Sequence, residues 1–159
     1  MIRTLITLAL VLASAPATTS AQQPAAQSPP YCAQLQRVAG LALTSERFAS
    51  IAGTPREGDF FNTTLALTGW KDCSLYGPRA YTCDSQNLAT AEEAEKEQAR
   101  TLQVIKACLG DGWAEAKDRS SPTYVVLHSA PWPISITLST DQTDDKQHVV
   151  RLILFRRGN

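Results

Sequence analysis

The chain has 159 residues, a length at which a single domain is usual. Hydrophobic residues make up 43% of it and charged residues 19%, which allows an ordinary buried core and argues against wholesale disorder. Fifteen basic residues balance fifteen acidic ones, which argues against nucleic acid as a partner because phosphate binding requires an excess of basic residues on one face. No apolar run reaches the roughly 20 residues of a membrane-spanning helix, so the mature chain is expected to have no membrane span.

The first residues have the pattern of a secretory signal peptide. Arg3 gives a positive start, residues 5–15 are apolar and uncharged, and small residues ending at Ala21 form a cleavage site. An uncleaved anchor is the alternative, but the apolar stretch is short for a span. The segment that follows is rich in proline and glutamine and has no apolar period. The expected organisation is a signal peptide over residues 1–21, a flexible spacer over residues 22–30 and one domain over residues 31–158.

Four cysteines behind a signal peptide predict two disulfides and an exported location, either the periplasm or the extracellular space. Cys73 and Cys83 lie symmetrically about Pro78, so a hairpin that turns there places them opposite each other on two antiparallel strands. Of the three possible pairings, we therefore expect Cys73 with Cys83 and Cys32 with Cys108. Metal binding is the alternative, but no two cysteines have the short spacing of a structural zinc site.

Two helices are predicted. The first runs from Cys32 to Phe48, where apolar residues recur at spacings of three and four. The second begins at Thr90, which forms a capping box with Glu93, and ends at Gly110, which suits a left-handed C-terminal cap. Its expected apolar stripe consists of Ala91, Ala94, Leu102, Ile105 and Leu109. If both helices pack on one face of a sheet, the start of the first meets the end of the second, as the second disulfide requires.

Five strands are predicted around these helices. Alternation begins at Phe61, and the first strand is expected to run on to Trp70 and into the cysteine hairpin, whose return forms the second strand. Three more strands are expected over residues 123–128, 134–139 and 149–155, and the last of them is apolar on both faces apart from Arg151. The order α-β-β-α-β-β-β predicts an α+β two-layer domain, with an antiparallel sheet of about five strands and two helices on one face.

His128 and His148 are the only histidines and are expected near the ends of neighbouring strands. With Asp141, Asp144 or Asp145 they could bind a metal ion and support a small metal-dependent hydrolase. Their spacing matches no familiar ligand pattern, so we favour surface polar groups and expect neither a metal nor a cofactor. No nucleophile elbow, phosphate-binding glycine loop or zinc-protease helix is present, which favours a protein without catalytic activity.

Two carboxylates offer a second catalytic hypothesis. Asp72 and Asp84 extend the expected register of the cysteine hairpin and would face each other across it. Like charges at such positions destabilise a sheet, so either the register changes locally or Lys71 relieves the repulsion. A carboxylate pair with a raised pKa is the functional alternative, which we do not favour.

The aromatic residues favour a binding function. Trp132 lies between Pro131 and Pro133 in a connection between two strands, and the prolines hold this segment stiff. A stiff, exposed tryptophan is a typical binding anchor. The alternative, which we favour for this ring, is a lid folded over the sheet. Trp70 and Trp113 are expected in the core.

The last strand carries three arginines: Arg151, Arg156 and Arg157. They could form a small basic patch that meets an acidic partner, or they could neutralise the acidic hairpin beside them. These observations together favour a small exported non-enzymatic binding module, such as an inhibitor, an immunity protein or an envelope accessory protein. Its expected partner is another envelope or extracellular protein. Binding of a small ligand in a cleft between helices and sheet is the other interpretation.

Overall fold

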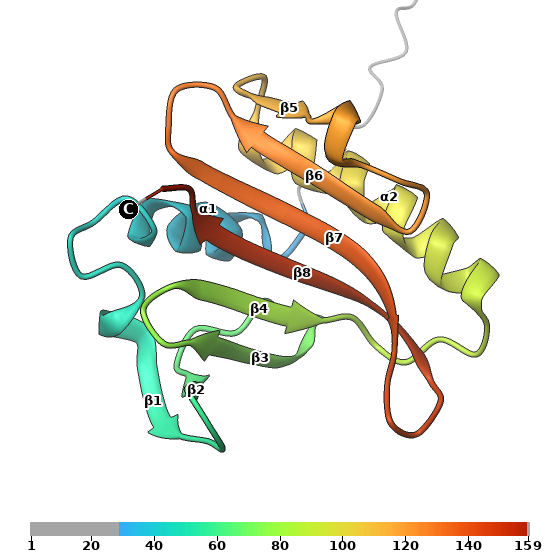
Figure 1. Ribbon diagram of the computed structural model, residues 1–159, viewed down its shortest axis with the longest axis horizontal. Coiled ribbons are helices and arrows are strands. Elements are labelled where there is room, and N and C mark those ends of the chain that lie inside the picture. Colours follow the sequence, from blue (N-terminus) through green and yellow to red (C-terminus); the bar gives the residue numbers. More distant parts are fainter. Residues whose placement is uncertain (1–28, 159) are drawn as a thin grey trace, which may run out of the picture.

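The computed structural model describes residues 29–158, which contain two α-helices and eight strands (Figure 1). The predicted signal peptide and most of the predicted spacer lie outside these residues. The helices are α1 (Cys32–Leu41) and α2 (Ala91–Leu109), with short 3-10 helices at Ala49–Ile51 and Lys117–Arg119. The strands are β1 (Ala52–Pro55), β2 (Phe60–Thr63), β3 (Lys71–Tyr76), β4 (Ala80–Asp84), β5 (Trp113–Glu115), β6 (Tyr124–Ser129), β7 (Ile134–Gln142) and β8 (His148–Arg156).

All eight strands belong to one antiparallel sheet, in the order β1-β2-β3-β4-β8-β7-β6-β5. The α+β class is confirmed, but the expected sheet of about five strands is wrong. The predicted strand from Phe61 to Trp70 stops at Thr63, and β3 begins only after a loop. The edge strands β1 and β5 have four and three residues, too few for an alternating pattern to be visible in the sequence.

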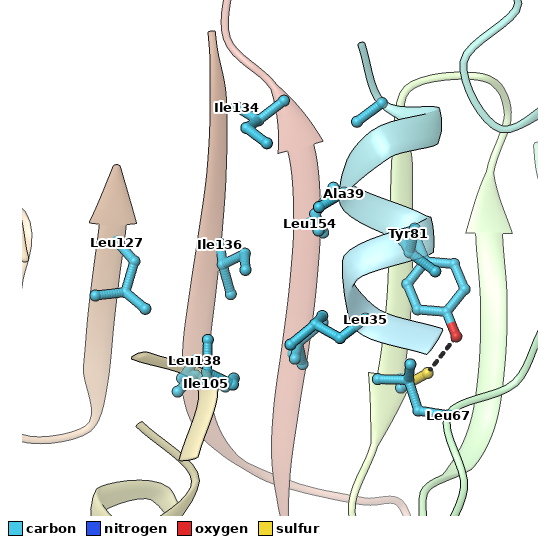
Figure 2. Close-up of a cluster of buried hydrophobic side chains, with 14 of the residues drawn as sticks. Leu35, Ala39, Leu67, Tyr81, Ile105, Leu127, Ile134, Ile136, Leu138 and Leu154 are labelled. Carbon is cyan, nitrogen blue, oxygen red and sulfur yellow. Dashed lines mark hydrogen bonds between the residues drawn. The ribbon is translucent and has the colours of Figure 1, made fainter. Parts of the chain in front are cut away.

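The two helices cover one face of the sheet and lie behind it in Figure 1. Figure 2 shows Leu35 and Ala39 of α1 beside Leu154 of β8, while Ile105 of α2 reaches the same buried cluster over Leu138 of β7. Each of the three leucines and Ile105 is fully buried. Because burial of one such side chain contributes about 1.5–3 kcal/mol, this layer between helices and sheet holds the fold together.

Helix α1 ends seven residues before the predicted terminus at Phe48, since its last residue is Leu41. The Leu41 carbonyl accepts hydrogen bonds from both the amide and the hydroxyl of Thr44, at 3.0 and 2.8 Å, which closes a turn in place of a further helical turn. Arg47 has a φ of +52°, which a helix does not allow. Phe48 still reaches the core, so its apolar character reflects burial and not helix periodicity.

Helix α2 begins and ends where the sequence predicts. The Thr90 hydroxyl accepts a hydrogen bond from the Glu93 amide at 3.1 Å, and the Glu93 carboxylate accepts one from the Ala89 amide at 2.9 Å. Gly110 has a φ of +78° and donates its amide to the Lys106 carbonyl. Capping interactions of this kind depend on neighbouring residues alone, which explains why the sequence predicts them well.

The buried face of α2 differs from the predicted stripe. Ala91 is exposed, whereas Gln98 and Thr101 are buried. The side-chain amide of Gln98 donates to the Leu138 carbonyl at 2.8 Å, so burial of this polar group carries little penalty. A pattern of apolar residues alone cannot anticipate a buried polar residue whose partner lies 40 positions away.

Both disulfides join the cysteines paired in the sequence analysis. Cys73 and Cys83 link β3 to β4, and Cys32 links the start of α1 to Cys108 at the end of α2, where Gln36 also donates to the Cys108 carbonyl at 2.6 Å. Two disulfides are typical of an oxidising, exported location. Neither helix in residues 29–158 is long and apolar enough to cross a membrane.

Candidate functional site

The two histidines lie on strands that are not neighbours. His128 is paired with Ser135 of β7, and His148 is paired with Gln142 at the other end of the same strand. Seven residues of β-strand separate these positions, a distance of about 23 Å. Within residues 29–158, no three His, Cys, Asp or Glu side chains come close enough to hold a metal ion. The histidines therefore do not form the three-ligand site that the metal-dependent hydrolase requires.

His128 has surroundings that disfavour its charged form. Its Nδ1 lies 2.6 Å from the Ser135 hydroxyl. Partial burial lowers its pKa, and the positive charges of Arg157 and Arg119 lower it further, while Asp118 acts in the opposite direction. The surroundings of this histidine therefore favour its neutral, hydrogen-bonding form more than water does.

The pKa of His128 gives the stability of the protein a defined pH dependence. Because the pKa is lower in the folded state, protonation near the ordinary value of 6.5 favours the unfolded chain. The contribution is complete above that value and decreases as the pH falls toward the folded pKa. We expect the free energy of unfolding of the wild type, relative to His128→Gln, to decrease between about pH 7.5 and pH 5 in urea denaturation. Parallel curves for the two proteins would contradict this expectation.

The predicted pairing of Asp72 with Asp84 does not occur, because the register changes locally. Asp84 is opposite Lys71, and the hairpin register shifts next to Asp72, whose φ is +48°. Asp84 instead binds Arg151 of β8 through two hydrogen bonds of 2.7 and 2.9 Å, and these bonds raise the pKa of Arg151. Asp141 approaches the same guanidinium at 3.4 Å. Asp84 and Asp141 are thus held by one cation, and Asp72 and Asp84 do not form the carboxylate pair considered above.

Trp132 is exposed, contrary to the favoured expectation of a lid. Its side chain is 48% exposed, more than any other large hydrophobic side chain in residues 29–158. Trp113 is buried in the core as expected, and Trp70 is half-buried, with its ring 6.0 Å from that of Tyr31. Trp132 is therefore the tryptophan that a partner can reach.

The loop that carries Trp132 is fixed by the residue after β8. The Arg157 guanidinium donates to the carbonyls of Ser129 and Trp132, at 2.9 and 3.0 Å, and the Arg157 amide donates to the Pro133 carbonyl. The amide of Ile134 closes a tight turn onto the Trp132 carbonyl at 2.8 Å. These bonds fix the Arg157 guanidinium against the loop within its own chain.

The other side of this loop rests on Gly112. The Ala130 amide donates to the Gly112 carbonyl at 2.8 Å, and a methyl group at Gly112 would be in ordinary van der Waals contact with Pro131 Cδ, at 3.6 Å. Backbone contacts on both sides, together with Pro131 and Pro133, leave the loop little conformational freedom. The indole of Trp132 is thus presented on a stiff support.

Sequence reasoning missed a groove on the face of the sheet opposite the helices. Its volume is about 830 Å³, and we call it the outer-face groove. The groove lies over β2, β3, β4 and β8 and is walled by the turn after β1. Its residues are Arg56, Glu57, Gly58, Phe60, Asp72, Ser74, Tyr76, Ala80, Thr82, Asp84, Arg151 and Ile153.

The signal for this groove is weak in the sequence because its residues come from four separate segments. Ser74 and Tyr76 alternate with Leu75, which shows only that they lie on the opposite face of the hairpin from Leu75; Ser74 is itself buried and Tyr76 is exposed. Nothing local indicates that Ile153, 71 residues after Thr82, lies beside it in the sheet. Which strand lies next to β4 is decided only when the whole sheet forms.

Comparison with known proteins adds no information on function. No protein-family model matches the chain, and no curated protein or solved structure matches it either. The function is therefore argued from the residues themselves.

Proposed function

We propose that this protein is a small exported binding protein without catalytic activity, and that its partner contacts the Trp132 loop. The observation that carries the proposal is the 48% exposure of Trp132 on a loop pinned by Arg157 and Gly112. A large aromatic side chain on a backbone already held in place loses less conformational entropy on contact than one on a mobile loop, and aromatic residues of this kind are frequent at the energetic centre of protein interfaces.

The two disulfides support a partner in the same oxidising location. A protein in the envelope or in the extracellular space fits this requirement, and inhibitors, immunity proteins and envelope accessory proteins act there by binding alone. The predicted signal peptide over residues 1–21 agrees with export to the periplasm or beyond the cell.

Substitution of the exposed tryptophan tests the proposal. We expect wild-type protein to capture one envelope or extracellular protein from an extract of its source, and Trp132→Ala to lose it. With the purified partner, the Kd should rise at least about 30-fold, the change that corresponds to a central interface residue. Stability should change little, since the ring is half exposed.

Tyr124→Ala is the matched control. Tyr124 is 43% exposed, but it begins β6, whereas the Trp132 loop follows the end of that strand. This variant should bind the partner like the wild type. Equal losses in the two variants would show that the loss is not specific to the Trp132 loop and would contradict the proposal, and unchanged binding by Trp132→Ala would refute the proposed role of the loop.

Binding of a small molecule is a second candidate function, and the outer-face groove is the observation that favours it. The groove lies on the sheet face without helices, not in the cleft between helices and sheet considered in the sequence analysis. Its volume falls within the roughly 300–1,000 Å³ of known ligand sites.

A further inference from the structure

The outer-face groove has an aromatic end. Phe60 of β2 and Tyr76 of β3 are directly opposite in the sheet, with ring centroids 5.2 Å apart. They are 41% and 37% exposed, although both lie where a ligand in the groove would cover them. The Arg79 guanidinium lies 5.7 Å from the Tyr76 ring centre, which leaves Phe60 as the more accessible ring. This pair provides an electron-rich surface for the weakly positive hydrogens of a ligand.

The middle of the groove carries hydroxyl groups beside an apolar side chain. Ser74 and Thr82 are partners across β3 and β4, and Ile153 is the partner of Thr82 on β8. Among the described residues, no hydrogen-bond partner is found for the hydroxyl of Ser74 or of Thr82. A hydroxyl both donates and accepts, so it is suited to ligand groups that do the same.

The far end of the groove is ionic, but its charges are nearly balanced. Arg151 lies there with Asp72 and Asp84, whereas Arg56 and Glu57 belong to the turn beside Phe60, where the Arg56 amide donates to the Phe60 carbonyl. The groove as a whole has a formal charge of −1 (two positive against three negative). Arg151 is already bound by Asp84 and approached by Asp141, so it is not free to pair with an anion. The Asp84 carboxylate keeps lone pairs that can accept further hydrogen bonds.

We propose that the outer-face groove binds a neutral saccharide. The C–H face of a sugar ring would lie against Phe60 and Tyr76, and its hydroxyls would bond to Ser74, Thr82 and Asp84. A wholly apolar ligand would bury these polar groups without partners, which is unfavourable. An ionic ligand would meet a charge of its own sign at the mixed end. The proposal is independent of the Trp132 loop, which lies outside the groove.

Binding of three uncharged trisaccharides tests this inference: maltotriose, cellotriose and N,N′,N″-triacetylchitotriose. Each is titrated into the wild-type protein, with the aromatic cation phenethylammonium and the aromatic anion phenylacetate as charged probes, and binding is followed by ligand-observed NMR. We expect at least one trisaccharide to bind with a Kd of about 1 mM or below, and both charged probes to bind more weakly.

Three variants connect that binding to the groove. Phe60→Ala should weaken it at least about tenfold, and Thr82→Val, which replaces a hydroxyl with a methyl group of similar size, should weaken it about three- to tenfold. Tyr124→Ala should have no effect, because Tyr124 is equally exposed but does not line the groove. Unfolding transitions measured for each variant show that the comparison is made between folded proteins.

The inference is overturned if no trisaccharide binds at about 10 mM, or if a charged probe binds more tightly than all three. It is also overturned if Phe60→Ala binds the saccharide as the wild type does, since the site would then lie elsewhere. None of these results affects the Trp132 proposal, which is tested with a protein partner.

Discussion

Replacement of Cys32 and Cys108 together by alanine is expected to lower the free energy of unfolding by about 4.5 kcal/mol. The disulfide closes a loop with a sequence separation of 76, and it restricts the unfolded chain far more than a short loop would. It also joins the start of α1 to the end of α2, next to the hydrogen bond from Gln36 to the Cys108 carbonyl. Urea denaturation followed by circular dichroism measures the change.

The hairpin disulfide is the matched comparison. Cys73 and Cys83 are separated by only ten positions, so the double alanine variant should lose about 2.7 kcal/mol. The hairpin turn and the neighbouring strands hold these two residues close even without the bond. If the two double variants lose equal stability, or the hairpin variant loses more, loop closure is not the dominant contribution of these disulfides.

Substitution of Leu154 by alanine is the second large effect that we expect, a loss of about 3–4 kcal/mol in the free energy of unfolding. Leu154 is fully buried beneath α1, and its removal leaves a cavity between helix and sheet (Figure 2). Ile153→Ala is the control on the next residue of β8. Its side chain faces the outer-face groove and is only partly buried, so about 1–2 kcal/mol should be lost.

This pair of variants also tests which face of β8 is the core. Denaturation curves measured under identical conditions give the difference directly. A larger loss for Ile153→Ala than for Leu154→Ala would mean that the helices pack on the other face. The outer-face groove, and the saccharide inference with it, would then be wrong.

The cysteine hairpin shows what local sequence can predict. Cys73 and Cys83 are equidistant from Pro78, and a turn at that proline brings them together without help from the rest of the chain. The cap of α2 at Thr90 and Glu93 is equally local. The order of helices and strands then leads to the α+β class, because alternating and helical apolar periods differ clearly in the longer elements.

The candidate site was only partly predictable, because local sequence determines the stiffness of the Trp132 loop but not its exposure. The stiffness of the Trp132 loop follows from Pro131 and Pro133, but its exposure does not, since an indole ring can cover a sheet as readily as leave it. What keeps the ring outside is a loop position set by Arg157, from beyond the end of a different strand. The sequence contains no mark of that contact.

The amino-acid sequence by itself determined the hairpin disulfide, the ends of α2 and the fold class, all of which depend on neighbouring residues or on the period of one segment. The Cys32–Cys108 pair then followed by elimination. Only the tertiary structure decided that β1 and β5 join the sheet and which face of β8 is buried. It also placed Asp84 against Arg151, 67 positions away, and assembled the outer-face groove from four segments. These features result from packing between distant parts of the chain, and packing selects among local alternatives that have nearly equal free energy.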